Sequence, residues 1–162
     1  MKIGITGHQK LKDLSWDWCK NQMSTILDNL GSELIGYSCL AAGADQIFVR
    51  ILLEKGGNFI AILPFNGIER TFKDSDDLLE FNALLHIASE VKILPDQPDD
   101  EISYFNAGKL VVDFSEMLVA VWDGKAAAGL GGTGDIVKYA QKLGKNIIII
   151  NPYLESVSPN EK

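Results

Sequence analysis

The sequence predicts an α/β fold: a single open, doubly wound, mainly parallel sheet with helices on both faces. Two observations support this. Short strands alternate with helical segments along the chain. In addition, Phe59–Leu63, Met117–Trp122 and Ile147–Ile150 are nearly unbroken apolar runs. Strands that are apolar on both faces are typical of parallel sheets with helices packed on each side.

The spacing of apolar residues predicts each element in turn. Helices are predicted where apolar residues recur every three or four positions, as at Cys19, Met23 and Leu27, with Gly31 ending that helix. Residues 1–152 form one predicted domain, and residues 153–162 a flexible tail. The predicted elements are strand Lys2–Thr6, helix Trp16–Leu30, strand Leu34–Ser38, helix Ala44–Leu52, strand Phe59–Leu63, one or two polar helices between Gly67 and Ser89, strand Val91–Leu94, helix Ile102–Phe114, strand Met117–Trp122, helix Ile136–Leu143 and strand Asn146–Ile150.

The composition fits one globular domain and limits its partners. The chain has 162 residues, of which 46% are hydrophobic and 23% charged. Its net charge of −7 and pI of 4.8 disfavour sequence-independent binding to nucleic acid or anionic lipid. No apolar run approaches the roughly 20 residues of a membrane helix. We therefore expect a small-molecule ligand, no nucleic acid and no membrane.

The cysteines and other candidate metal ligands carry little signal. Cys19 and Cys39 form no metal or redox motif, and no His/Cys/Asp/Glu cluster has metal-ligand spacing. We expect no metal, no cofactor and a cytoplasmic location. Cys39 could face His8 across adjacent strands as a thiol–imidazole pair, although an inert buried thiol is the simpler interpretation.

The strongest functional signal is the segment Gly131-Gly132-Thr133-Gly134-Asp135, which follows an apolar strand and opens a helix. A glycine turn at a helix start leaves several backbone N–H groups unpaired, and the helix dipole adds partial positive charge there. Such a place suits a phosphate or a carboxylate. The segment therefore predicts a nucleotide-type ligand.

Further glycine-bearing segments follow the first two predicted strands and the strand ending at Trp122. In open α/β sheets, ligands bind outside the carboxyl ends of the strands, so these segments are expected to converge at one edge. Gly7 permits close approach of the backbone, and Asp123 is placed to bind ribose hydroxyls or a base amine. The predicted ligand-binding residues are Thr6, Gly7, His8, Gly43, Ala44, Asp45, Asp123, Gly124, Gly131, Gly132, Thr133 and Gly134.

Each segment also has a purely structural interpretation. Asp45 could simply compensate a helix dipole, and Asp123 with Gly124 could form an ordinary turn. Gly129, Gly131 and Gly134 match a G-x-G-x-x-G pattern. That pattern should directly follow the first strand of a βαβ unit, so a conventional NAD site is not expected.

Together these motifs resemble the Rossmann-like nucleotide-binding superfamily of the Lonely Guy phosphoribohydrolases and DNA-processing protein A. The stretch Asp113–Lys145 is also similar to nucleoside 2-deoxyribosyltransferases in its strand, Asp-Gly, Gly-Thr and helix order. The resemblance implies nucleotide or nucleotide-derived ligands along the glycine-rich edge, and a homodimer or larger oligomer. Some members cleave an N-glycosidic bond, and others only bind. Where the enzymes carry a glutamate after the glycine loop, this chain has Asp135.

Three hypotheses follow. The first is a protein that binds a nucleotide or a nucleotide-derived molecule. The second is an N-glycosidic hydrolase or transferase, in which Asp135 stabilises or attacks the sugar while Asp45 or His8 moves protons. The third is a scaffold whose sheet edge is filled by its own side chains. The position of the Asp135 carboxylate discriminates between the first two hypotheses. A carboxylate beside a sugar-sized space would support the enzyme, and one that caps its own helix would support the binding protein.

The connecting segment after the third predicted strand is acidic but carries five apolar residues. They either cover the sheet or form an interface between copies of the chain. These residues are Ile68, Phe72, Leu78, Leu79 and Phe81.

Overall fold

A computed structural model describes residues 1–31, 33–126 and 129–159. In these ranges no helix is long and apolar enough to cross a membrane. The strands are β1 (Lys2–Gly7), β2 (Ile35–Ser38), β3 (Asn58–Leu63), β4 (Glu90–Ile93), β5 (Met117–Val121), β6 (Asn146–Asn151) and β7 (Ser156–Pro159). The helices are α1 (Asp17–Leu30), α2 (Ala44–Glu54), the 3-10 helix η1 (Ile68–Thr71), α3 (Ser75–Ile87), α4 (Asp100–Phe114) and α5 (Thr133–Lys142).

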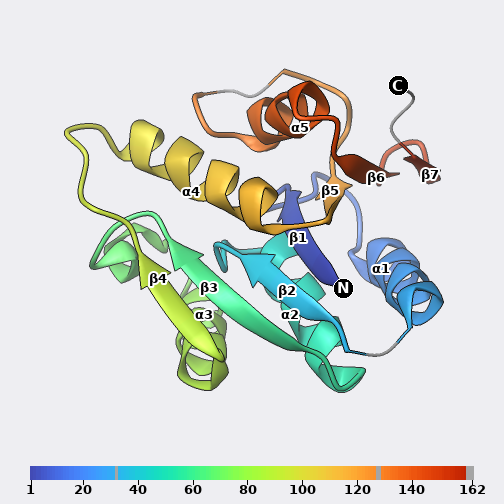
Figure 1. Cartoon of the computed structure of the whole chain (residues 1–162), viewed down its shortest axis with the longest axis horizontal. Coiled ribbons are helices and arrows are strands. Elements are labelled where there is room, and N and C mark those ends of the chain that lie inside the picture. Colours follow the sequence, from blue (N-terminus) through green and yellow to red (C-terminus); the bar gives the residue numbers. More distant parts are fainter. Residues whose placement is uncertain (32, 127–128, 160–162) are drawn as a thin grey trace.

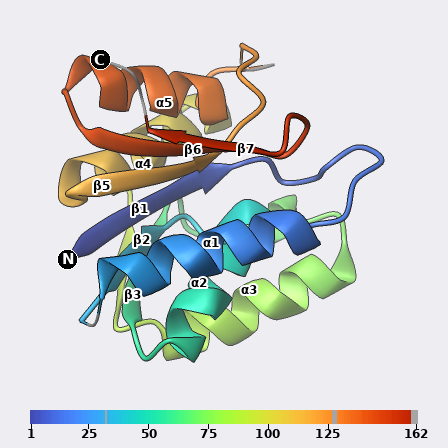
Figure 2. The same cartoon turned by 90° about the vertical axis from the view of Figure 1, so that its right-hand side faces the viewer.

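The strands form one sheet in the order β4-β3-β2-β1-β5-β6-β7. Each pair is parallel except β6 with β7, which is antiparallel. Helices α1, α2 and α3 lie on one face, and α4 and α5 on the other (Figures 1 and 2). The predicted doubly wound, mainly parallel sheet of the Rossmann-like class is therefore confirmed.

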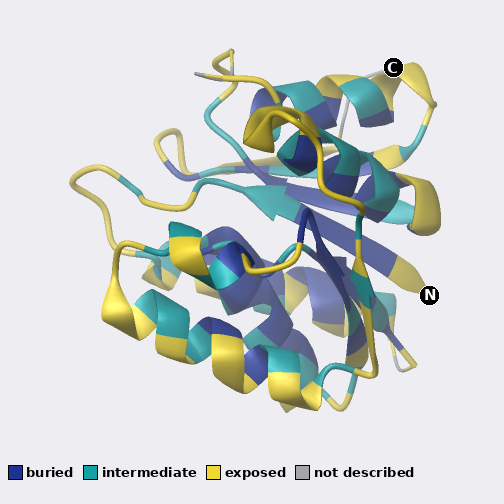
Figure 3. Cartoon of the chain, turned by 90° about the vertical axis from the view of Figure 1, so that its left-hand side faces the viewer, coloured by how far each residue is buried: buried dark blue, intermediate teal, exposed yellow. Residues whose placement is uncertain are grey.

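Each face of the sheet has its own hydrophobic core. Under α1–α3 the core includes fully buried Phe48, Phe59 and Phe81. Under α4 and α5 it includes Ile62, Leu118 and other side chains of β3, β5 and β6. The exposed residues gather on the outer sides of the helices and on the loops (Figure 3). Both faces of the central strands are thus buried, as unbroken apolar runs require.

The observed elements differ from the predicted ones mainly at the C-terminal end. Residues 156–159, expected in a flexible tail, form the edge strand β7 against β6, although all four are exposed. Residues 160–162 of that expected tail lie outside the described residues. Helix α5 begins at Thr133, three residues before the predicted start, because the helix includes the end of the glycine loop.

The apolar residues of the acidic connecting segment mostly cover the sheet. Ile68 and Phe81 are buried in the core, and Phe72 and Leu78 pack against it. Leu79 is 67% exposed on α3. Packing onto the sheet therefore accounts for four of these five side chains.

Two glycines allow the start of α2 to approach the end of β1. A Cβ atom on Gly7 would lie 2.5 Å from the Ala44 Cβ, and one on Gly43 would lie 2.3 Å from the Gln9 carbonyl oxygen. Gly43 also has a φ of 78° and a ψ of −120°, a conformation that favours glycine. The Ala44 N–H then donates to the His8 carbonyl at 3.1 Å. This contact places the β2–α2 loop against the β1–α1 loop.

We predict that Gly43→Ala lowers the free energy of unfolding by about 2 kcal/mol or more, because it combines backbone strain with a collision against backbone atoms. Gly56→Ala is the matched control: Gly56 has the same φ of 78°, but a Cβ there meets nothing within 4 Å. Urea unfolding of both variants measures the difference. Equal losses would contradict the close approach.

Candidate functional site

A cavity of about 590 Å³ opens at the carboxyl end of the sheet, where strand order reverses between β1 and β5. Open α/β sheets place ligands at this crevice. The loops after β1, β2 and β5, the glycine loop and α4 form its walls. Nine of the predicted ligand-binding residues line it: Thr6, Gly7, His8, Asp45, Asp123, Gly131, Gly132, Thr133 and Gly134.

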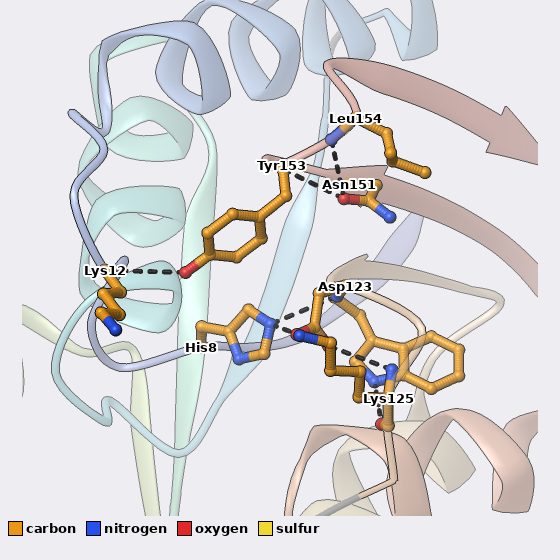
Figure 4. A network of polar contacts seen from close by, with 8 residues as sticks. His8, Lys12, Asp123, Lys125, Asn151, Tyr153 and Leu154 are labelled. Atoms are coloured by element: carbon orange, nitrogen blue, oxygen red, sulfur yellow. Dashed lines mark hydrogen bonds and ion pairs between the residues drawn. The ribbon is translucent and has the colours of Figure 1, made fainter.

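His8 and Asp123 meet across the β1–β5 boundary (Figure 4). Gly7 pairs with Val121 in register, so the residues that follow the two strands leave the sheet side by side. The His8 Nε2 accepts the Asp123 N–H at 3.2 Å and lies 3.5 Å from the Asp123 Oδ1. Accepting this bond requires a neutral imidazole with its proton on Nδ1. His8 is therefore held in one orientation by the loop opposite.

The loop after β5 is ordered by its own side chains. The Asp123 carboxylate accepts the Lys125 N–H at 3.1 Å, and the Lys125 Nζ lies 3.7 Å from it. The Trp122 indole N–H donates to the Lys125 carbonyl at 2.8 Å. Gly124, with a φ of 83°, makes the sharp turn between them. One Asp123 oxygen thus supports the turn while the side chain also lines the cavity.

The glycine loop presents free backbone donors at the start of α5. Asp135 and Ile136 donate their N–H groups to the Gly132 carbonyl, at 3.0 and 3.3 Å. The N–H groups of Thr133 and Gly134, the first two helical residues, have no partner within the described part of the chain. Both residues line the cavity, so two unpaired donors and the positive end of the helix dipole meet there.

Asp135 is engaged within its own loop. Its carboxylate accepts the Gly131 N–H at 3.1 Å, and the residue is not among those lining the cavity. Gly131 has a φ of 86°, and a Cβ there would lie 2.6 Å from the Phe105 backbone nitrogen. The loop is therefore held between α5 and α4.

Cys39, directly after β2, and Asp45, at the start of α2, line another part of the cavity. The buried Asp45 carboxylate accepts the Ser38 hydroxyl at 2.9 Å and the Cys39 N–H at 3.1 Å. Burial raises the pKa of Asp45 to about 7, although these hydrogen bonds oppose the shift. Burial, and then the nearby Asp45, raise the pKa of Cys39 well above its usual value. The thiol is therefore protonated and a poor nucleophile at neutral pH.

Helix α4 supplies a wall that the sequence did not predict as part of the site. The Glu101 carboxylate accepts the Leu130 N–H at 3.3 Å, and Tyr104 lines the same cavity. Both residues come from the polar start of a helix far along the chain from β1. Acidic residues are common in the first turn of a helix because they interact favourably with the helix dipole. The sequence therefore offered no reason to assign Glu101 to the site.

Three predicted ligand-binding residues do not line the cavity. Gly43, Ala44 and Gly124 act on its shape instead, by allowing α2 to approach β1 and by turning the β5 loop. Within the ranges described, no three His, Cys, Asp or Glu side chains are grouped to hold a metal ion.

A larger hollow of about 840 Å³ lies between α1, α2 and α3. Its sides are helical surfaces with charged side chains, including Arg50, which makes two hydrogen bonds to the Glu80 carboxylate. Neither the glycine loop nor the pair His8 and Asp123 lines it. We therefore place the candidate site at the sheet edge rather than in the larger groove.

Comparison with known proteins supports the fold. DNA processing protein A from Streptococcus pneumoniae matches with a TM-score of 0.64 and 15% identity, over 93% of this chain and 50% of that chain. The Helicobacter pylori protein matches with a TM-score of 0.61 and 17% identity, over 93% and 65%. The structural-genomics target TM1055 matches with a TM-score of 0.56 and 14% identity, over 90% of this chain and 71% of that chain.

These similarities confirm the Rossmann-like fold that the resemblance implies. The chain spans about half the length of the Streptococcus pneumoniae protein. No family model and no curated protein sequence matches the chain.

The expectation that the chain has no nucleic-acid partner is wrong. DNA processing protein A from Helicobacter pylori has this fold and binds single-stranded DNA. The expectation was drawn from the net charge of −7, which describes the whole chain and not one edge of it. Lys10, Lys73 and Lys125 all line hollows at the carboxyl edge of the sheet. Asp45, Asp77 and Asp123 line the same hollows, so both signs of charge meet at this edge, and the net charge of the whole chain does not describe it.

We predict that Asp45 makes the protein less stable as pH rises from about 4 to about 7. Because its folded pKa lies above its unfolded value, the folded state holds a proton in this window that the unfolded state has released. Wild type should lose roughly 2–4 kcal/mol relative to Asp45→Asn across the window, at about 1.4 kcal/mol per pKa unit. Urea unfolding as a function of pH measures this.

Asp17→Asn is the control for this prediction, since Asp17 is also an acidic first-turn residue but has a side chain that is 81% exposed. This variant should keep the wild-type pH dependence. Parallel pH profiles for wild type and Asp45→Asn would contradict the burial argument.

Proposed function

We propose that this protein binds a nucleotide or a nucleotide-derived small molecule in the cavity between the ends of β1 and β5. One observation carries the proposal: the unpaired N–H groups of Thr133 and Gly134 line a cavity whose other side holds His8 and Asp123. Donors at a helix N-terminus suit a phosphate. A carboxylate nearby suits the hydroxyl groups of a sugar.

The proposed roles follow from these positions. The segment Gly131–Gly134 holds the phosphate, with Thr133 and Gly134 donating backbone hydrogen bonds. Asp123 accepts from ribose hydroxyls through the oxygen that does not support the β5 turn. His8, with its proton on Nδ1, supplies one further donor, and Thr6 and Gly7 form the floor.

Binding without turnover is the better-supported proposal. The Asp135 carboxylate already accepts the Gly131 N–H, and the Asp45 carboxylate accepts from Ser38 and Cys39. A nucleophile or an oxocarbenium stabiliser needs a carboxylate oxygen directed at the sugar. Asp135 does not line the cavity, so it is not proposed as that group. Asp45 was expected to move protons, and its oxygen that accepts these two hydrogen bonds is not available to do so.

We predict that at least one nucleoside monophosphate raises the melting temperature. At 100 times its Kd, a ligand adds about 2.7 kcal/mol to stability, which corresponds to a shift of roughly 5–10 °C for a domain of this size. The thermal scan includes inorganic phosphate, ribose 5-phosphate, the four ribonucleoside monophosphates and a short single-stranded oligonucleotide. A shift with the oligonucleotide alone would replace the small-molecule proposal, and no shift with any of them would reject it.

We predict that Gly132→Val removes phosphate-dependent binding and leaves a cooperative fold. Gly132 caps α5 with a φ of −69° and a ψ of 169°, which valine adopts without strain, so the cost in stability is about 1 kcal/mol. The added side chain would occupy the cavity beside the free donors. Lys138→Val, on the exposed face of the same helix, is the control and should bind as wild type does. Unchanged affinity in Gly132→Val, measured by calorimetry, would show that the phosphate lies elsewhere.

A further inference from the structure

A second hollow, of about 480 Å³, adjoins the cavity described above. We call the cavity at the glycine loop the first lobe and this one the second lobe. They share wall residues on the loops after β1, β2 and β3 and on α4, so they are adjacent parts of one cleft. The second lobe also borders the larger groove, through Lys10, Asp74 and Asp77. The shared residues are Gln9, Cys39, Ala41, Pro64 and Tyr104.

The second lobe has apolar walls that are fixed by packing. Phe72, on one side, packs against buried Phe81 with ring centroids 4.9 Å apart. Tyr104, shared by both lobes, packs against Phe65 at 5.7 Å. Ile68 adds a buried aliphatic surface. Walls that are held in this way lose little side-chain freedom on binding, and the aromatic rings among them can pack against a flat ligand.

The polar groups of the second lobe include both a free acceptor and free donors. Asp77, Lys10 and Lys73 line it, and none of the three side chains makes a hydrogen bond or a close ion pair among the described residues, although the charge of Lys10 acts on Asp77. Asp74 differs, because its carboxylate caps α3 by accepting the Asp76 and Asp77 N–H groups. The lobe thus offers both signs of charge beside an apolar surface.

We propose that the second lobe binds the base of the nucleotide: a planar, purine-sized heteroaromatic ring that carries both amino donors and ring or carbonyl acceptors. This inference rests on the proposed function, with the phosphate in the first lobe. The flat walls suit the faces of such a ring, and the mixed charges suit its edge. An alkyl chain would make no use of these polar groups, and a second phosphate would meet the Asp77 carboxylate.

The junction of the lobes fits the sugar between them. Ala41 and Cys39 contribute small side chains to both lobes, and His8 and Asp123 lie on the first-lobe side. The Cys39 thiol is neutral, so it neither attracts nor repels a sugar by charge. Asp77 then recognises amino groups on the base, while Lys10 and Lys73 donate to its acceptors.

The test compares a purine nucleoside monophosphate with ribose 5-phosphate, which lacks the base. For wild type we expect the nucleotide to bind at least about tenfold more tightly by calorimetry. Ala42→Phe should fill the second lobe, because Ala42 lines that lobe and not the first. It should remove the tenfold advantage and leave ribose 5-phosphate binding unchanged. Thr71→Trp, from the η1 side, makes the same test if Ala42→Phe does not fold.

Leu79→Trp is the matched control, since it places a large ring on an exposed outer position of α3 and should keep the tenfold advantage. If the filled variants retain that advantage, or if wild type shows none, the base lies outside the second lobe and the inference is wrong. If ribose 5-phosphate and inorganic phosphate also fail to bind wild type, the proposed function itself fails. The two failures are therefore distinguishable.

Discussion

The site depends on the parallel pairing of β1 with β5. The connection that follows β1 leads to α1 on one face of the sheet, and the connection that follows β5 leads to α5 on the other face (Figures 1 and 2). The two connections diverge in this way at the carboxyl ends of the two strands and leave a crevice there. The register that pairs Gly7 with Val121 brings the two following loops level, and His8 then accepts a hydrogen bond from Asp123. The cavity, its opposed walls and the orientation of the imidazole all follow from this pairing.

Close packing on either side of this pair completes the cavity. Gly43 lets α2 approach the loop that carries His8, and Gly131 lets the glycine loop approach α4. The Tyr153 hydroxyl accepts the Lys12 N–H at 2.9 Å, so the turn after β6 supports the same β1–α1 loop (Figure 4). A preorganised site of this kind loses little freedom on binding, which favours affinity from few contacts.

The sequence predicted β3, β5 and β6 well because each of these buried strands is a nearly unbroken apolar run. It predicted the common edge because parallel strands share a carboxyl end. It missed β7 because Ser156–Pro159 is short, polar and exposed, with only its pairing to β6 to order it. The sequence left the role of Asp135 undecided, because an acidic side chain at the start of a helix can face either the ligand or its own loop. It missed Glu101 and Tyr104 because their position depends on how α4 crosses the sheet, a long-range contact without a local pattern.

The most direct measurement of the central claim is a titration of the isotope-labelled protein with a purine nucleoside monophosphate, followed through backbone amide NMR signals. The account predicts the largest shifts at the amides of Thr133 and Gly134, with accompanying shifts at His8 and Asp123. Shifts centred on Ile47 and Arg50, in the larger groove between α1, α2 and α3, would contradict it.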